Sequence, residues 1–312
     1  MENVKGKTAF ITGGASGLGL GIAKACAKAG MNIIIVDMRQ KAIDEVLPIF
    51  KENGWPVHGI VLDVTDREAY VKAAEEAEAT FGNIHILVNN AGIGVPEGPV
   101  WTDSYKDVDL MIDVNLKGVL NGIMTIVPRM LAHGEDSHVV STASKAGLIP
   151  VPGFTLYNAT KQAVIAIMET LASDLADKNI GSSVFCPGPF QSNLGQSSGE
   201  VRAAHLGVDL PPVSPPPAPP KDGEAPAVPQ VDFSKIIKPA DEAGERVLRG
   251  ILRGDLYIIT HVDFKKGVQA RSDALLRAFP DEPLNEEFLK VFSMLAYNPV
   301  FDKQTLVPAL EE

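Results

Sequence analysis

The sequence has little cysteine and shows no pattern typical of a signal peptide or a membrane-spanning segment. Only two of its 312 residues are cysteine, Cys26 and Cys186, which do not have the CxxC spacing of a metal or redox motif. The opening stretch MENVKGKTAFITGG has no signal-peptide pattern, and no apolar run reaches about 18 residues. We therefore expect a soluble cytoplasmic protein without a membrane partner.

Positive charge is also scarce. Lys and Arg number 28 against 39 Asp and Glu, which gives a formal net charge of −11, and no run concentrates basic residues. Binding to a phosphate backbone requires a basic surface, so nucleic acid is excluded as a partner. The six histidines lack metal-ligand spacing, so we expect no metal site. Only His261, after the last predicted strand, is a candidate for the substrate side.

What the sequence does contain is a regular alternation of apolar runs and helical segments. The runs are continuously apolar, as expected of parallel strands that are covered on both faces. This alternation predicts an α/β fold: a doubly wound parallel Rossmann sheet of about seven strands with helices on both faces, formed by the single domain 1–312. The predicted strands are 8–12, 32–37, 59–63, 85–90, 138–144, 182–188 and 256–260.

The helical segments differ in their apolar pattern. Helices are expected at about 18–28, 41–53 and 241–253. Another helix, the third along the chain, is expected to begin at Thr65, with Glu68 three residues later completing a capping box. Its acidic run EEAEA at 75–79 is expected to face solvent. The helices at about 105–131 and 155–177 are apolar nearly all the way round, so a second buried surface is needed. We predict a homodimer or homotetramer that packs through them.

A proline-rich insertion at about 208–232 interrupts this rhythm. Seven of the ten residues at 211–220 are proline, a composition that cannot form a helix or a central strand. An interdomain linker, a ligand for an SH3-like partner and a flap over a site are the alternatives. A flap or surface excursion is favoured, because strands and helices resume after it. The C-terminal extension at about 263–312 contains no recognisable motif.

A glycine-rich turn, TGGASGLGLG, follows the first predicted strand directly and leads into a helix. Glycine permits tight backbone geometry and close approach, and the free N–H groups of a helix N-terminus attract a pyrophosphate. We predict that this turn binds a dinucleotide through Gly13, Ser16, Gly17, Leu18 and Gly19.

Acidic residues follow the next two strands. Asp37 ends the second strand, where a carboxylate can accept hydrogen bonds from an adenosine ribose and would repel a 2′-phosphate, which favours NAD over NADP. Arg39 complicates this, because it could stack on the adenine or tolerate a phosphate. Asp63 and Val64 end the third strand and are expected to meet the adenine.

Several motifs fall in the order typical of one family. The glycines have the spacing G-x-x-x-G-x-G after Thr12, followed by NNAG at 89–92, YNATK at 157–161 and PGPFQS at 187–192. Over about residues 5–195 the chain resembles the short-chain dehydrogenases/reductases. The last motif of that family usually ends in threonine; Ser192 keeps the hydroxyl. The stretches NGIMT at 121–125 and LYIITH at 256–261 are similar to bacterial Cα-dehydrogenases that oxidise the benzylic alcohol of lignin-derived aryl ethers.

Removal of hydride from an alcohol also requires a base for the hydroxyl proton, and Tyr157 is our candidate. A free phenol titrates near ~10, so its pKa must fall; Lys161, one helical turn away, and a positive nicotinamide could lower it. Ser144 would donate a hydrogen bond that orients the substrate oxygen. The resemblance implies that Asn115 holds a proton-relay water and that Lys161 also holds the nicotinamide ribose.

Further cofactor contacts are expected where ligands bind open α/β sheets, at the carboxyl ends of the strands. There we place Asn90, Ala91 and Gly92 after the fourth strand, and Pro187 and Ser192 beside the nicotinamide amide.

The sequence thus predicts an NAD-dependent oxidoreductase that interconverts a secondary alcohol and a ketone, with a bulky aromatic or cyclic substrate. A ketoacyl, steroid or sugar-alcohol reductase with the same machinery is the enzymatic alternative. The non-enzymatic alternative is a nucleotide-sensing Rossmann protein without catalytic activity. Ser144, Tyr157 and Lys161 together disfavour the sensor, since a sensor has no need of proton transfer.

Overall fold

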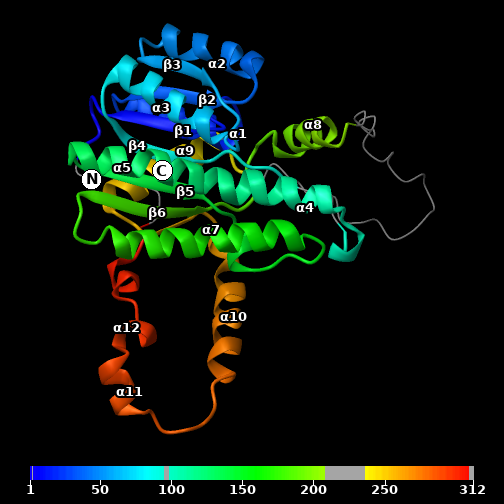
Figure 1. Cartoon of the computed structure of the whole chain (residues 1–312), viewed down its shortest axis with the longest axis vertical. Helices are drawn as coiled ribbons and strands as arrows, with labels where there is room; N and C mark the ends of the chain where they lie inside the picture. The colour runs from blue at the N-terminus through cyan, green and yellow to red at the C-terminus, as the bar shows by residue number, and fades with distance from the viewer. Residues whose placement is uncertain (2, 95–97, 208–235, 309–312) are drawn as a thin grey trace.

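A sheet of seven parallel strands forms the centre of the molecule (Figure 1). The computed structural model describes residues 1, 3–94, 98–207 and 236–308. Strand order is β3-β2-β1-β4-β5-β6-β7, which confirms the predicted doubly wound sheet. The strands are β1 Thr8–Thr12, β2 Asn32–Asp37, β3 Val57–Val61, β4 Ile84–Asn89, β5 Ser137–Thr142, β6 Ile180–Cys186 and β7 Tyr257–Ile259.

Helices cover both faces of the sheet. One apolar cluster lies under α1, α2 and α9, and a second lies under α3, α5 and α7. Because the central strands are covered on both sides, every residue of β1, β4 and β5 is buried, as the sequence predicted of covered parallel strands. The helices are α1 Gly17–Lys28, α2 Gln40–Glu52, α3 Arg67–Phe81, α4 Tyr105–Ile112, α5 Gly118–His133, α6 Lys145–Leu148, α7 Thr155–Asp174, α8 Leu194–Leu206 and α9 Ala240–Arg253.

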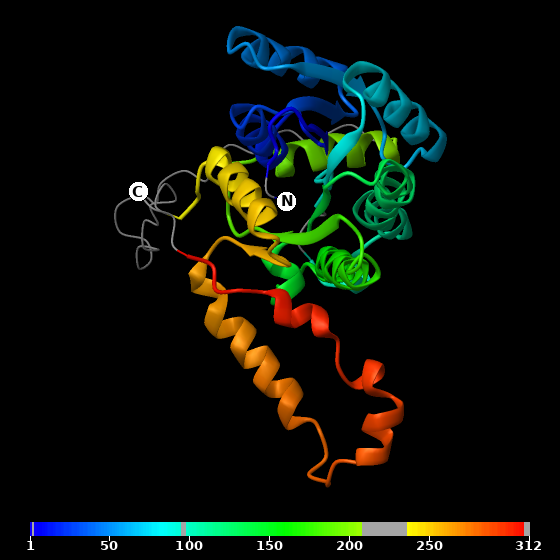
Figure 2. The ribbon, with the colours of Figure 1, turned by 90° about the vertical axis from the view of Figure 1, so that its left-hand side faces the viewer.

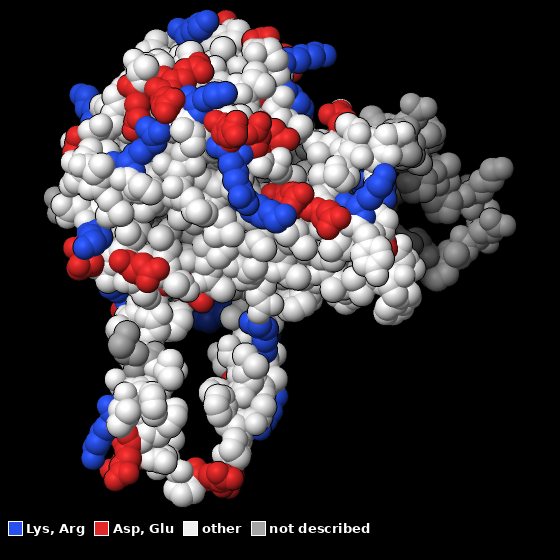
Figure 3. All heavy atoms as spheres, in the orientation of Figure 1, with Lys and Arg blue, Asp and Glu red and all other residues white. Residues whose placement is uncertain are grey.

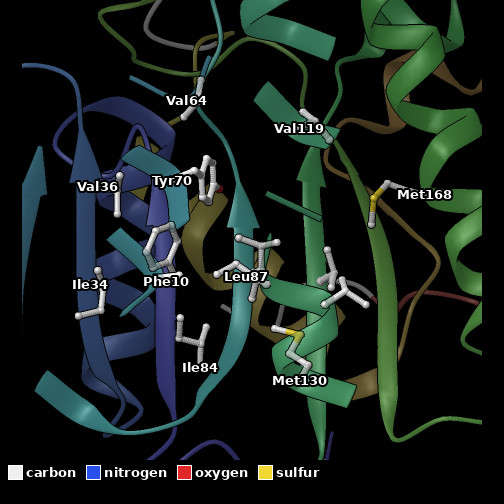
Figure 4. Packing of buried hydrophobic residues seen from close by; sticks show 14 of the residues in the cluster. Phe10, Ile34, Val36, Val64, Tyr70, Ile84, Leu87, Val119, Met130 and Met168 are labelled. Atoms are coloured by element: carbon white, nitrogen blue, oxygen red, sulfur yellow. The ribbon is translucent and has the colours of Figure 1, made fainter. Parts of the chain in front are cut away.

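Aromatic and long aliphatic side chains fill the second cluster between the central strands and α3 (Figure 4). The rings of Phe10 and Tyr70 stack with centroids 5.8 Å apart, and both side chains are fully buried. Leu87 and Met130 complete this part of the core. Each such side chain contributes about 1.5–3 kcal/mol by leaving water, which holds the strand ends of the sheet in fixed positions.

Two local predictions for the third strand and helix were wrong. Strand β3 ends two residues earlier than predicted, and α3 is capped by Asp66 rather than by Thr65. Asp66 accepts a hydrogen bond from the backbone N–H of Ala69 (3.0 Å), while the Thr65 hydroxyl donates to Asp63 (2.8 Å). A carboxylate one residue later therefore caps the helix and displaces the hydroxyl.

The predicted helix at about 105–131 is continuous but not uniform. A π-helical segment, η2 Asp113–Lys117, joins α4 to α5. The span Tyr105–His133 is long and apolar enough to cross a membrane, yet half of its most apolar window is buried inside the protein, as in a core helix. On α7, the apolar residues Val164, Ile165 and Met168 are buried within the chain. Ile167 and Leu171 on the same helix are only partly buried, so part of its apolar surface remains open to a partner.

The C-terminal extension leaves the body of the molecule as two legs (Figures 1 and 2). It comprises η4 Val262–Phe264, α10 Lys265–Arg277, α11 Glu286–Val291, α12 Ser293–Ala296 and η5 Pro299–Lys303. The proline-rich residues 211–220, for which we predicted a flap or a surface excursion, lie outside the described residues.

Candidate active site

A cleft of about 540 Å³ opens at the carboxyl ends of the central strands. Most of the predicted cofactor residues meet there, although they come from five different strand ends. The predicted residues that line it are Gly13, Ser16, Gly17, Leu18, Asp37, Arg39, Asp63, Val64, Asn90, Ala91, Gly92, Tyr157, Lys161, Pro187 and Ser192. Of the predicted residues, Gly19, Asn115 and Ser144 do not line the cleft.

The glycine-rich turn after β1 has the backbone geometry of a cradle. Gly13 and Gly17 have φ values of +61° and +50°, which side chains rarely allow. A Cβ at Gly19 would lie 2.1 Å from the carbonyl oxygen of Gly13 and 2.6 Å from Nδ2 of Asn90. The turn therefore folds tightly against the end of β4, and the first N–H groups of α1, which have no partner within the helix, can bind a phosphate.

Thr12, at the end of β1, fixes the two loops that meet in the cleft. Its hydroxyl accepts hydrogen bonds from the backbone N–H groups of Asn90 (3.0 Å) and Ala91 (3.1 Å). The Asn90 amide donates to the Thr12 carbonyl (3.1 Å) and accepts from the Thr142 hydroxyl (3.3 Å). Asn90 thus links the ends of β1, β4 and β5, which makes it a structural part of the site.

Asp37 is buried at the end of β2 and is already engaged by Arg39. Asp37 Oδ1 accepts from Nε of Arg39 (3.0 Å) and Oδ2 accepts from Nη2 (3.3 Å). The same Nη2 donates to the Ser16 hydroxyl (3.2 Å), so the guanidinium bridges the carboxylate and the glycine-rich turn. Both residues line the cleft, but sequence reasoning missed that they pair. This pairing holds the pKa of Arg39 above its usual value.

Tyr157 lies in the first turn of α7, partly buried in the cleft wall. Burial raises the pKa of its phenol, and a hydrogen bond with Ser144 acts in the opposite direction without cancelling it. Ser144 caps α6, where its hydroxyl also accepts from the backbone N–H of Ala146 (3.1 Å). The lowered phenol pKa expected from the sequence is therefore not a property of the protein alone.

Lys161 follows one turn later on α7 and is almost fully buried. Its Nζ donates to the carbonyl oxygen of Thr142 (2.9 Å) and lies 5.6 Å from the centre of the Tyr157 ring. A Cβ added to Gly92 would lie 3.4 Å from that Nζ, so glycine leaves room for the ammonium. Burial lowers the pKa of Lys161 to about 8. A shift of this kind at a cleft is typical of functional lysines.

We expect Lys161→Met to stabilise the protein without ligand at pH 7. A fall in pKa from 10.5 to about 8 means that the buried ammonium costs about 3 kcal/mol, and the lost hydrogen bond to Thr142 offsets about 1 kcal/mol of the gain. The free energy of unfolding from denaturant titration should rise by about 2 kcal/mol. The difference in unfolding free energy between variant and parent should shrink between pH 8 and 10.5. In this range Lys161 of the unfolded parent keeps a proton that the folded parent has released, so the parent becomes more stable as the pH rises.

Lys41→Met is the matched control, since its side chain is 89% exposed and should change stability by less than about 0.5 kcal/mol. A Lys161→Met protein less stable than the parent at pH 7 would show that the ammonium is well solvated.

Asn115 lies in the π-helical segment η2 and is fully buried behind Gly92. Its Oδ1 accepts from the backbone N–H of Ile93 and its Nδ2 donates to the Ile93 carbonyl, both at 2.8 Å. The side chain therefore fixes the loop that follows β4. Single π turns inside helices often accompany functional sites, because the extra residue redirects a side chain.

One wall of the cleft was missed by sequence reasoning. Helix α8 supplies five lining residues: Leu194, Ser197, Val201, Ala204 and His205. Arg202 fastens the helix to α4 through both carboxylate oxygens of the buried Asp107 (2.5 and 3.1 Å), and Ser198 accepts from the backbone N–H of Gly94 (2.8 Å). Gly207, left-handed with φ +68°, ends the helix and was the one available signal.

His261, the one histidine that the sequence left as a candidate for the substrate side, does not line the cleft. It is buried behind the turn at 187–190, where its ring packs edge-on against Phe190 with centroids 5.4 Å apart. Its Nδ1 shares a 2.7 Å hydrogen bond with the Thr260 hydroxyl, which accepts from the backbone N–H of Gly188 (3.1 Å). A Cβ at Gly188 would lie 2.5 Å from Nδ1 of His261, so the residue packs against this turn and supports it.

Comparison with known proteins agrees with the geometry of this cleft. The family profile of the short chain dehydrogenases matches residues 7–203. A curated relative, C alpha-dehydrogenase from Sphingobium sp. strain NBRC 103272 / SYK-6, is 34% identical over 276 residues, which cover 88% of this chain and 87% of that protein.

Solved structures give the same answer over nearly the whole chain. A protein described as a short-chain dehydrogenase from Novosphingobium aromaticivorans has a TM-score of 0.77 at 30% identity, with 97% of this chain and 99% of that chain covered. A short chain dehydrogenase/reductase from Burkholderia phymatum, solved in complex with NAD, has a TM-score of 0.76 at 29% identity, with 91% and 100% covered. This chain therefore belongs to the short-chain dehydrogenase family and is an oxidoreductase that interconverts an alcohol and a ketone.

Proposed function

We propose that the chain is an NAD-dependent dehydrogenase of a bulky secondary alcohol, with a benzylic alcohol of the lignin-derived aryl ether type as the preferred substrate class. One observation carries the proposal: a single cleft joins the glycine cradle, Asp37, and the Tyr157 and Lys161 side chains. A binding protein would need the cradle but not a buried ammonium next to a phenol.

The cofactor fits the residues present. A Cβ at Gly13 or Gly17 would come within about 3.0–3.2 Å of the facing loops, so the missing side chains leave the backbone open to a pyrophosphate. Asp37 and Arg39 lie where the adenosine ribose would be held, and Asp63 and Val64 where the adenine would lie. When bound, the oxidised nicotinamide accepts the hydride and contributes a positive charge to the cleft.

In the proposed mechanism, the Tyr157 phenolate removes the proton of the substrate hydroxyl while hydride leaves the carbon that bears this hydroxyl. Because burial raises the phenol pKa in the protein alone, the lowering must come from positive charge in the loaded cleft. The Lys161 ammonium supplies part of that charge and would hold the nicotinamide ribose. Ser144 orients the substrate oxygen, and Asn115 positions the loop after β4 or, as the resemblance implies, a relay water.

An apolar chamber beside Tyr157 supports a bulky substrate. Leu110 and Ile93 are buried there, and Val114 and Val201 pack against them in the cleft wall. An aryl group buried against these side chains would gain roughly 25 cal/mol per Å² of apolar surface, whereas a sugar alcohol would leave hydroxyl groups without partners. The likeness to the Sphingobium C alpha-dehydrogenase points to the same substrate class.

A substrate panel tests this proposal. The purified chain, given NAD, should form NADH with benzylic aryl ether alcohols at a kcat/KM at least about tenfold above that for sugar alcohols. Steroid, cyclic and β-hydroxyacyl alcohols in the same panel represent the alternative reductases. A protein that binds NAD but oxidises none of these alcohols would instead be a nucleotide sensor.

Asp37→Ser tests the preference for NAD. Loss of the carboxylate removes its repulsion of a 2′-phosphate and releases Arg39 to bind one. The ratio of kcat/KM with NAD to kcat/KM with NADP should fall by at least about tenfold. Asp44→Ser, at an exposed carboxylate on α2, is the matched control. An unchanged ratio in Asp37→Ser would place cofactor selection elsewhere.

We also propose that the protein acts in the cytoplasm on a small-molecule substrate and forms a homodimer or homotetramer through the helices at about 105–131 and 155–177. The exposed Met124 and Leu131 on α5 support that contact. Sedimentation of a monomer at micromolar concentration would refute it.

A further inference from the structure

We name residues 265–298, which form the two legs near the C-terminus, the arm. The two legs extend from the body of the molecule and do not pack against one another. Neither α10 nor α11 has a buried residue. Open space separates the legs in the space-filling view (Figure 3), and the perpendicular view shows the arm extending well beyond the sheet and its helices (Figure 2). Apart from its two ends, the arm therefore has no core of its own.

Both ends of the arm are fixed to the body by close contacts. At the start, Gly267 approaches Ile149 so closely that a Cβ would lie 2.5 Å from the Ile149 side chain. At the end, Asn298 and Ser173 on α7 exchange hydrogen bonds of 2.9 and 3.1 Å, and Val300 is 3% exposed. The arm is therefore held in a defined direction at both ends.

The surface of the arm is unusually apolar. Among the described residues, nine of the 25 exposed large hydrophobic side chains lie in the 34 residues of the arm. Exposed apolar patches of this size mark interaction surfaces. They are Leu275, Leu276, Phe279, Leu284, Phe288, Val291, Phe292, Leu295 and Tyr297.

The helices of the arm are too short to be stable without a partner. Helix α10 has 13 residues, α11 six and α12 four, whereas isolated helices below about 12–15 residues are marginal in water. Packing of an apolar face normally supplies the missing stability. Within the part of the body that the structure describes, nothing supplies it, which favours a second molecule as the source.

We propose that the occupant is a second copy of this chain, whose arm packs against this one about a two-fold axis. An isologous contact needs a self-complementary surface, and the densest run of exposed apolar side chains on the described chain is the arm itself. Nine large side chains that are 45–79% exposed present on the order of 1,000 Å² per arm, compared with about 800 Å² per partner in a standard interface.

Charge distinguishes a second copy from a membrane. The arm carries five Lys and Arg and five Asp and Glu, so its net charge is zero. The four carboxylates of Asp281, Glu282, Glu286 and Glu287 gather at the turn between the legs and the start of α11, whereas four of the five basic residues lie on α10. Interfacial helices that bind anionic lipid carry an excess of Lys and Arg. A neutral arm with one basic and one acidic part suits the self-complementary surface of a second copy better than an anionic bilayer.

The test compares the full chain with the double variant Leu276→Asp and Leu295→Asp, which changes one exposed leucine on each leg. In the parent at micromolar concentration, amides in 270–277 and 286–296 should exchange at least about tenfold more slowly than in the double variant. In mixed light and isotopically heavy protein, Lys266 or Lys290 should crosslink light to heavy copies, and the double variant should lose these crosslinks.

Val71→Asp, at a 40% exposed position on α3, is the control. It should keep the slow amide exchange of the arm and the light–heavy crosslinks of the parent. Both readouts are local to the arm, so an oligomer held together elsewhere does not imitate the result. Equal exchange rates in parent and double variant, absence of light–heavy crosslinks, or protection only with vesicles of phosphatidylcholine and phosphatidylglycerol would overturn the proposal.

Discussion

Tyr157→Phe should lower kcat by at least about 100-fold while NADH binding stays nearly intact. The phenol oxygen is the only atom lost, and we assign it the proton transfer that accompanies hydride removal; such groups contribute about 10²–10⁴-fold. The ring keeps its place against the buried cluster of Ile93, Leu110 and Met111, so the cleft keeps its shape. Steady-state kinetics and NADH fluorescence titration measure the two quantities separately.

Tyr105→Phe makes the same chemical change at a side chain that is 90% exposed, and it should leave kcat unchanged. Full activity in Tyr157→Phe would refute the assignment of the base. Equal loss of turnover and of NADH binding would mean that the hydroxyl holds the cofactor instead.

Gly19→Ala should cost about 2–4 kcal/mol of stability and at least about tenfold in cofactor affinity. The added methyl would stand 2.1 Å from the Gly13 carbonyl, and backbone cannot yield as a flexible side chain can. Relief requires the cradle to shift away from the end of β4, which also moves the N–H groups that would hold the pyrophosphate. Denaturant titration and NADH titration measure the two effects.

Gly195→Ala is the matched control, because a Cβ at that helical position meets nothing within 4 Å. A small gain in stability is expected there from the better helix propensity of alanine. A Gly19→Ala protein with the affinity of the parent would show that the cradle does not depend on this contact.

The parts of the fold that local pattern determines could be predicted from the sequence. Continuous apolar runs gave the strands within about two residues, and glycine after β1 gave the turn, because glycine readily adopts the φ of +61° at Gly13, which other residues rarely do. Spacing along one helix also placed Tyr157 and Lys161 together in the cleft.

The parts that depend on long-range contacts could not be predicted. Helix α8 covers the cleft because Arg202 reaches Asp107, 95 residues away in the sequence. The raised pKa of Tyr157 follows from burial, which no local pattern reveals. His261 follows the last strand, as predicted, but packing against Phe190 turns it away from the cleft.

Transfer of a label from substrate to cofactor tests the central claim most directly. A benzylic aryl ether alcohol with deuterium on its carbinol carbon is incubated with NAD and the purified chain, and the mass of the NADH is determined. Direct hydride transfer predicts that each NADH carries one deuterium and that Tyr157→Phe slows its formation by at least about 100-fold. Formation of the ketone with unlabelled NADH, or binding of NAD without any oxidation of such alcohols, would contradict the account.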